Sequence, residues 1–273
     1  MTSRHEAQQS LLEELRSNGS PEAIDAAARL RSAHHAQEMA MLSHDVYDSA
    51  RQAGDPPPGW VRATADLDAL RAALPGLQMK DDDLRDLLAP EKSGFRAEIY
   101  LPDPDVLGPG YKPTIVFKGS KGEVMENGAL RETVLEDFLG NNLPQSLGLQ
   151  TDYYDRAMRL AVALRRQGVE FDLAGHSLGG GMAAAASAVT GMRAVTYNAA
   201  GLHPNTAKDF AADRNIPLYD TLDHVTAWQV QGDLLNDGMQ SDLRGMSDMQ
   251  RERMALLLSN AVDAMRRAPA GRD

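Results

Sequence analysis

The stretch that decides the fold reads VEFDLAGHSLGGGMAAAAS and occupies residues 169–187. Its beginning, 169–174, has the length of a strand, and its last part begins a helix of small residues. Gly175-His176-Ser177-Leu178-Gly179 stands between the two. A Gly-x-Ser-x-Gly turn that joins a strand to a helix presents its serine above the sheet, where it can attack a substrate. We therefore predict that Ser177 is a catalytic nucleophile.

Outward from this turn, strands and helices alternate along the chain, which is typical of a mostly parallel sheet flanked by helices. The helix before the turn places Ala157, Leu160, Ala161 and Leu164 on one face, as packing on a sheet requires. We predict an α/β fold of the α/β-hydrolase type. Its strands are expected at 95–100, 114–117, 169–174, 193–198 and 225–230, and its helices at 152–166 and 178–190.

The first part of the chain has a different character, because Ala, Leu, Glu, Arg and Gln dominate it and predict helices over 6–51 and 64–88. We expect residues 1–92 to form an N-terminal helical extension packed on the core. Residues 93–273 are expected to form the hydrolase core, with a Met- and Leu-rich amphipathic helix over 242–267.

Composition narrows the range of functions and partners. The 273 residues carry a formal net charge of −11, which disfavours nucleic acid because binding a phosphate backbone needs clustered Lys and Arg. The chain holds no cysteine, so neither a disulfide nor a thiolate metal site can form. We expect no metal and no other cofactor, because Asp233, Asp237, Asp242 and Asp248 do not follow the spacing of a calcium-binding loop.

The N-terminal residues 1–15 carry charges throughout and lack the apolar stretch of a secretory leader. No apolar run in the sequence is long enough to span a bilayer. We expect the protein to be synthesised in the cytoplasm without a signal peptide, and any export to use a specialised secretion system.

A serine nucleophile needs a base, an acid that orients the base, and hydrogen-bond donors for the oxyanion. Asp233 is the predicted acid because it directly follows the last expected strand, at the end of a parallel sheet where ligands bind. Asp237 and Asp223 are the alternatives. The predicted oxyanion donors are the backbone N–H of Leu178 and an N–H of the loop 119–120, which follows the strand 114–117.

Several segments resemble the class 3, fungal-type triacylglycerol lipases and their bacterial lipase-like relatives. IVFKGS at 115–120 is similar to the family's strand followed by Arg-Gly-Ser/Thr, and DFLGNN at 137–142 is similar to its Asp-Trp-x-x-Asn segment. Tyr153, Tyr154 and Ala157 match the helix before the nucleophile strand, and MLSHDVY at 41–47 resembles the family's leading helix. The resemblance implies hydrolysis of carboxylic ester bonds in lipids, with the hydroxyl residue Ser120 serving the oxyanion hole.

The segment TYNAAGL at 196–202 looks most like that of bacterial phospholipase effectors. This resemblance implies a phospholipase A-type antibacterial or host-directed effector that acts on a lipid or phospholipid substrate at a membrane. It also implies an immunity or inhibitor protein that protects the producing cell. The alternatives are a non-catalytic hydrolase-fold protein that binds lipid or a partner, and a thioesterase or peptidase on the same fold.

Two features depart from the family's pattern. Lys118 and Phe138 replace the usual Arg and Trp, neither of which performs the chemistry. The family also places its catalytic histidine after the acid, whereas no histidine follows His224, which itself starts a strand at the wrong end of a parallel sheet. His176 is expected to point away from Ser177. The base is therefore either His203 or a histidine of a longer parent protein, and we expect the second.

Overall fold

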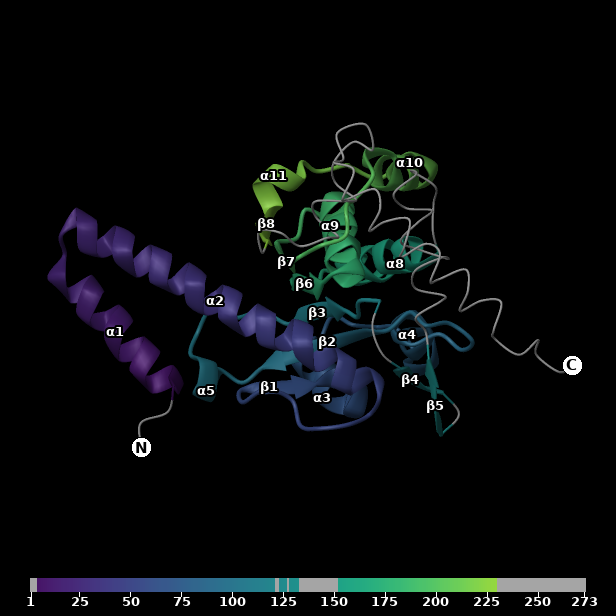
Figure 1. Cartoon of the computed structure of the whole chain (residues 1–273), viewed down its shortest axis with the longest axis horizontal. Helices are drawn as coiled ribbons and strands as arrows, with labels where there is room; N and C mark the ends of the chain where they lie inside the picture. Colours follow the sequence, from purple (N-terminus) through teal and green to yellow (C-terminus); the bar gives the residue numbers. More distant parts are fainter. Residues whose placement is uncertain (1–3, 121–122, 127, 133–151, 230–273) are drawn as a thin grey trace, which may run out of the picture.

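The structure is a computed structural model of the chain, and it describes residues 4–120, 123–126, 128–132 and 152–229 (Figure 1). Its centre is a six-stranded sheet with the strand order β1-β2-β3-β6-β7-β8. β1, β2 and β3 pair in antiparallel fashion, whereas β3, β6, β7 and β8 run parallel to one another. The strands are β1 (Trp60–Arg62), β2 (Ala97–Pro102), β3 (Thr114–Phe117), β6 (Asp172–His176), β7 (Ala194–Tyr197) and β8 (Val225–Trp228).

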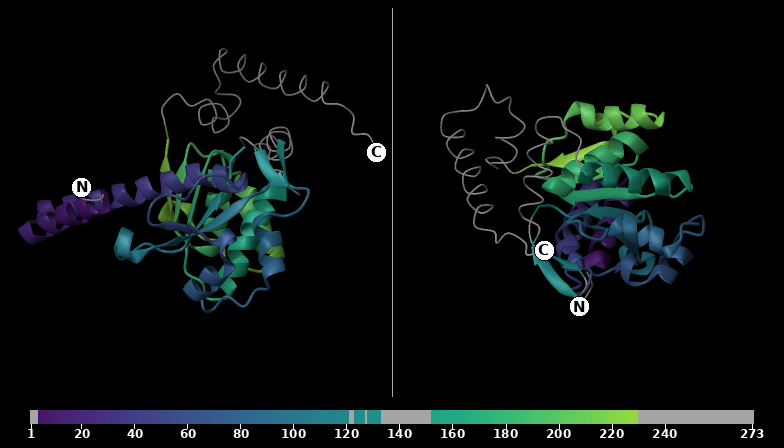
Figure 2. Two further views of the ribbon diagram at one scale, coloured as in Figure 1. Left: turned by 90° about the horizontal axis from the view of Figure 1, so that it is seen from below. Right: turned by 90° about the vertical axis from the view of Figure 1, so that its right-hand side faces the viewer.

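Helices pack on both faces of this sheet. The long helix α2 (Pro21–Ala50) crosses one face, and with α1 (Arg4–Asn18) it forms a hairpin that extends beyond the sheet (Figures 1 and 2). α8 (Asp152–Arg166) and α9 (Leu178–Thr190) belong to the other face. The shorter elements are η1 (Ala63–Ala65), α3 (Leu67–Ala73), α4 (Asp81–Leu88), α5 (Pro104–Leu107), α10 (Pro204–Arg214), α11 (Thr221–His224) and the hairpin of β4 (Glu123–Glu126) and β5 (Ala129–Glu132).

The two faces are distinct because side chains alternate along each strand. Ile115 and Phe117 of β3 point into an apolar core shared with α8 and α9, whereas Val116 between them points into a second core shared with α2. Leu173 and Ala174 of β6 divide between the two cores in the same way. α2 and α9 therefore pack on opposite faces of the same central strands.

The first turn of α9 lies against the sheet without space for side chains. A Cβ at Gly179 would lie 2.1 Å from the carbonyl oxygen of Phe117, and a Cβ at Gly181 would lie 2.1 Å from the hydroxyl oxygen of Tyr154 on α8. Native Cβ atoms do not make contacts this short, because protein interiors are already close-packed. The run of three glycines after Leu178 therefore lets α9, α8 and the sheet come together.

On the opposite face, α2 is held by buried polar groups. The Asp45 carboxylate, 6% exposed, accepts hydrogen bonds from Arg62 at 2.8 and 2.7 Å and from the Tyr100 hydroxyl at 2.6 Å. The Ser49 hydroxyl donates to the buried Glu98 carboxylate at 2.6 Å. Burial raises the pKa of Glu98, and burial together with the Asp45 charge raises the pKa of Tyr100 well above its usual value. These bonds fix α2 over β1 and β2.

Two further carboxylates extend this attachment of α2. Glu38 lies 3.1 Å from the Nε2 atom of His5 and so joins α2 to α1. Asp172, at the start of β6, pairs with Arg193 before β7 and lies 3.1 Å from Nε2 of His35 on α2. Although burial by itself raises the pKa of Asp172, the hydrogen bonds from His35 and Arg193 hold that pKa below its usual value. Buried carboxylates therefore lie on α2 or contact it along its second half, from His35 to Ser49.

The predicted fold class is confirmed, since a mostly parallel sheet flanked by helices has the α/β-hydrolase-like arrangement. α8 and α9 have the bounds expected from the sequence. Several details differ. β6 begins at Asp172 rather than at residue 169, and β2 runs two residues later than expected. Residues 60–62, inside the predicted helical extension, form the edge strand β1. Such a short strand shows no periodicity of its own and forms because it pairs with β2. The division of the chain at residue 92 stays a prediction.

Some predicted elements lie outside the described residues, namely the amphipathic helix over 242–267 and the segment 137–142. Among the helices that the structure describes, none combines the length and the apolar character needed to cross a membrane.

Candidate active site

Ser177 occupies the turn between β6 and α9 in a backbone conformation that side chains rarely adopt, with φ 58° and ψ −127°. Its carbonyl oxygen accepts hydrogen bonds from the N–H groups of Gly180 and Ala200, both at 2.9 Å, and its own N–H donates to Tyr197 at 3.0 Å. A non-glycine residue with positive φ costs energy and persists only where its surroundings hold it. These three hydrogen bonds hold the strained turn predicted for a nucleophile elbow.

The loop after β3 lies directly beside this serine. A Cβ at Gly119 would lie 3.4 Å from the Cβ of Ser177 and 2.6 Å from the carbonyl oxygen of His176. Lys118, only 3% exposed, donates from its Nζ to the Gly119 carbonyl at 3.1 Å. The structure thus brings the loop that carries Ser120 next to Ser177, as expected for a source of oxyanion donors.

Leu178 is the first residue of α9 and is fully buried. The first N–H groups of a helix have no carbonyl partner within the helix, and they carry the positive end of its dipole. The N–H of Leu178 therefore lies beside Ser177 at a helix end that favours a developing negative charge. The role of Leu178 as an oxyanion donor stays a prediction.

Tyr47 of α2 also reaches this region, which the sequence did not predict. A Cβ at Gly119 would lie 2.3 Å from its hydroxyl oxygen, and that oxygen lies 3.2 Å from Nδ1 of His176. In the sequence, the segment 41–47 carries only a resemblance to a leading helix. One sequence feature could have indicated that it reaches the site, namely the spacing of His44 and Tyr47, which puts both on one face of α2.

His44 and Tyr47 line a cavity of about 570 Å³ together with His176 and Tyr197 at the carboxyl ends of β6 and β7. Burial raises the pKa of Tyr197, and its hydroxyl donates to the carbonyl of Ala36. The described lining is completed by Ala40, Ser43, Asp48, Arg51 and Glu123. The cavity lies at the end of the sheet where α/β proteins bind ligands.

The structure separates the candidate histidines. His203 is the N-cap of α10, where its Nδ1 accepts a hydrogen bond from the N–H of Asn205 at 3.3 Å. His224 ends α11 immediately before β8 and packs edge-on against Tyr219, so it lies at the amino end of its strand, as expected. Within the described residues, no hydrogen bond joins Ser177 to an imidazole.

The predicted acid Asp233 and its alternative Asp237 lie outside the described residues, as do Asp242 and Asp248 of the same acidic stretch. The other alternative, Asp223, belongs to α11 at the amino end of β8 and is exposed there, away from the carboxyl end where Ser177 stands. In the part of the chain that the structure describes, no group of three or more His, Asp or Glu residues is arranged to hold a metal ion.

Comparison with known proteins agrees with this geometry. An extracellular phospholipase A1 of Serratia liquefaciens is 31% identical over an alignment of 159 residues that covers 54% of this chain and 44% of that protein. The chain thus spans less than half the length of the curated relative that it matches. The family model described as a phospholipase-like, Tle-like phospholipase domain matches residues 38–272, which include the elbow, the Gly119 loop and the cavity face of α2. The chain therefore belongs to the Tle-like phospholipase domain family.

Proposed function

We propose that this protein is a serine esterase that hydrolyses carboxylic ester bonds of phospholipids, as a phospholipase of the A type. The observation that carries this proposal is the strained turn at Ser177, packed against the Gly119 loop and the start of α9. Membership of a phospholipase-like family and the likeness to a phospholipase A1 support lipid ester hydrolysis. The cavity of about 570 Å³ beside the turn has the size of a small-molecule site.

In the proposed reaction, Ser177 Oγ attacks the ester carbonyl carbon while its proton passes to an imidazole oriented by Asp233. The N–H of Leu178 and the Ser120 loop hold the negative charge on the carbonyl oxygen. The ester bond breaks, the lysophospholipid leaves with the proton from the imidazole, and the acyl group stays on Ser177. Water then attacks the acyl-enzyme, releases the fatty acid and restores the serine.

The source of the imidazole is the open part of this scheme. A base in this arrangement presents one ring nitrogen to the serine and donates an N–H from Nδ1 to the acid. In His203, Nδ1 instead accepts the N–H of Asn205, which makes it a helix cap. This contact supports the expectation that a longer parent protein supplies the base.

Covalent labelling tests the nucleophile. A fluorophosphonate probe should label the chain within a longer parent protein, and Ser177→Ala should abolish both labelling and the release of fatty acid from phosphatidylcholine vesicles. Ser17→Ala is the matched control, because Ser17 is an exposed serine of α1 that does not line the cavity. If the parent protein is not labelled, or if Ser177→Ala retains full activity, a non-catalytic lipid- or partner-binding protein becomes the better explanation. Preferred cleavage of thioester or peptide substrates would instead favour a thioesterase or peptidase.

We further propose that the enzyme acts as an exported antibacterial or host-directed effector and that its producer holds a dedicated immunity protein. The resemblance of the segment 196–202 to phospholipase effectors motivates this proposal. Expression directed to the periplasm of a sensitive bacterium should stop growth, and Ser177→Ala should relieve the effect. If no protein of the producing cell both co-purifies with the chain and restores growth, the proposal of an immunity protein is wrong.

A further inference from the structure

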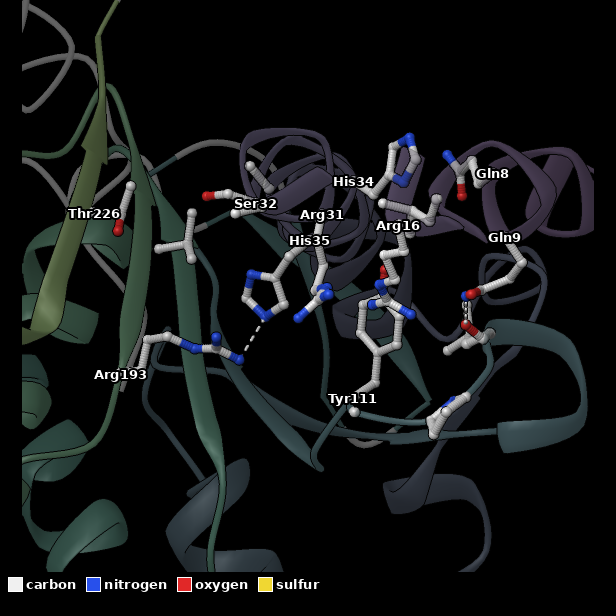
Figure 3. Close-up of a pocket in the computed structure, with 17 residues that line it drawn as sticks. Gln8, Gln9, Arg16, Arg31, Ser32, His34, His35, Tyr111, Arg193 and Thr226 are labelled. Carbon is white, nitrogen blue, oxygen red and sulfur yellow. Dashed lines mark hydrogen bonds between the residues drawn. The ribbon is translucent and has the colours of Figure 1, made fainter. Parts of the chain in front are cut away.

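A second cavity, of about 340 Å³, lies where the hairpin of α1 and α2 meets the sheet (Figure 3). Arg16 comes from α1, Arg31 from α2, and Arg193 from the residue before β7, and all three line it. Arg193 precedes a parallel strand, whereas Ser177 follows the neighbouring one. The cavity is therefore at the opposite end of the sheet from the proposed nucleophile.

The charge of this cavity is opposite to that of the chain as a whole. The chain holds 39 Asp and Glu residues against 28 Lys and Arg, yet the described residues that line the cavity include three arginines, two histidines and no carboxylate. Arg193 is compensated by Asp172, which lies beneath the lining. Arg16 and Arg31 form no ion pair with any residue that the structure describes. Positive charge gathered in a concave site attracts anions more strongly than the same charge on a flat surface.

The walls of the cavity are fixed by contacts within the protein. His35 stacks on Tyr111 with 5.8 Å between ring centroids, and its Nε2 lies 2.9 Å from Arg193. Gln9 donates to the carbonyl of Leu107 at 3.3 Å and so ties α1 to α5. Figure 3 shows the arginine side chains of both helices extending toward Tyr111. These contacts preorganise the part of the wall that His35, Tyr111 and Gln9 form, which lowers the entropic cost of binding a ligand there.

We propose that this cavity binds a phosphoryl anion. Arginine presents its N–H donors in a planar fork that matches the oxygens of a phosphate, and a site with guanidinium groups from three elements can contact several of these oxygens at once. The Gln8 amide and the Ser32 hydroxyl in the lining add uncharged donors. Most of these groups precede residue 38, where the match to the phospholipase family begins. The bound anion would stabilise the attachment of the α1–α2 hairpin to the sheet.

Calorimetric titration of the full chain with pyrophosphate, at constant ionic strength in chloride, tests the proposal. We expect saturable binding to the wild type, and a dissociation constant raised about tenfold or more by Arg16→Ala or by Arg31→Ala, since each removes charge-assisted hydrogen bonds. Arg29→Ala is the matched control, because Arg29 is exposed on the same helix, pairs with Asp25 and does not line the cavity. It should bind like the wild type.

The phosphoryl group can belong to a soluble ligand or to a lipid headgroup, and vesicles distinguish the two. The Ser177→Ala variant is mixed with phosphatidylcholine vesicles that contain phosphatidic acid. If the ligand is a headgroup, the fraction of protein that sediments with the vesicles should fall when Arg31→Ala is combined with Ser177→Ala. Binding of pyrophosphate with no Arg31-dependent binding to vesicles identifies a soluble ligand. The proposal is wrong if pyrophosphate does not bind saturably up to about 1 mM and vesicle binding does not depend on Arg31. It is also wrong if Arg29→Ala loses as much pyrophosphate affinity as Arg31→Ala.

Discussion

The two faces of the central sheet are covered by different chemistry. α8 and α9 pack through apolar side chains and glycines, and a Cβ at Gly179 would lie 2.1 Å from a backbone oxygen. α2 also packs on an apolar core, but it is held in addition by buried carboxylates such as Asp45 and Asp172, each paired with arginine. On the first face, an added methyl group would collide with neighbouring atoms. On the second face, removing one charged group would leave its partner buried and unpaired. Ser177 and Tyr47 meet where these two faces adjoin, beside Gly119.

The largest expected effect is that of Gly179→Ala on the close-packed face. The added methyl group would collide with the carbonyl of Phe117, and backbone atoms cannot move aside as the end of a flexible side chain does. We expect the variant to lose about 4 kcal/mol of its free energy of unfolding or to fail to fold. Gly110→Ala is the control, because nothing lies within 4 Å of its Cβ and only backbone strain is added. Chemical denaturation measures both, and equal losses would disprove the packing argument.

Asp45→Asn tests the charged face. The substitution leaves the guanidinium group of Arg62, only 11% exposed, without its carboxylate. Removing one member of a buried ion pair costs about 3 kcal/mol, because the remaining charge stays desolvated. Asp48→Asn on the same helix breaks the more exposed pair with Arg51 and should change stability by less than about 1 kcal/mol. Denaturant titration gives both values, and similar values for the two variants would contradict the proposed role of burial.

Tyr47→Phe tests whether α2 contributes to the site where the faces meet. The variant removes the hydrogen bond to His176 and loosens the packing around Gly119, so labelling of Ser177 by a fluorophosphonate should slow about tenfold. Tyr111→Phe, at the opposite end of the sheet, is the control and should react at the rate of the wild type. An unchanged rate in Tyr47→Phe would limit α2 to a structural role.

The smallest effect concerns the dependence of stability on pH. The pKa of Asp172 lies below its unfolded value of about 3.9, so its contribution is present above that pH and is lost as the pH falls through the folded pKa. Asp172→Asn should therefore lose less of its stability than the wild type as the pH falls from about 5 through the folded pKa of Asp172. Asp25→Asn, which removes an exposed pair with Arg29, should follow the wild type. Thermal unfolding over this range measures the difference, and parallel curves for all three proteins would refute it.

The sequence by itself determined the elements whose pattern is local. Gly175 to Gly179 predicted the turn, and the apolar spacing of 152–166 and the small residues of 178–190 predicted α8 and α9 with their observed bounds. The order of strands and helices predicted the mostly parallel sheet. These features follow from the period of side chains along a helix or strand and from the conformations open to glycine, which neighbouring residues decide.

Only the tertiary structure decided which distant residues share a site. Tyr47 lies beside Gly119 and His176 although more than 70 residues separate it from each, and Arg16, Arg31 and Arg193 converge from three elements on one cavity. β1 likewise exists because β2 offers an edge with which to pair. No period in the sequence encodes these contacts. They arise when α2 is placed over the sheet by buried carboxylates, and that placement depends on partners from separate strands at the same time.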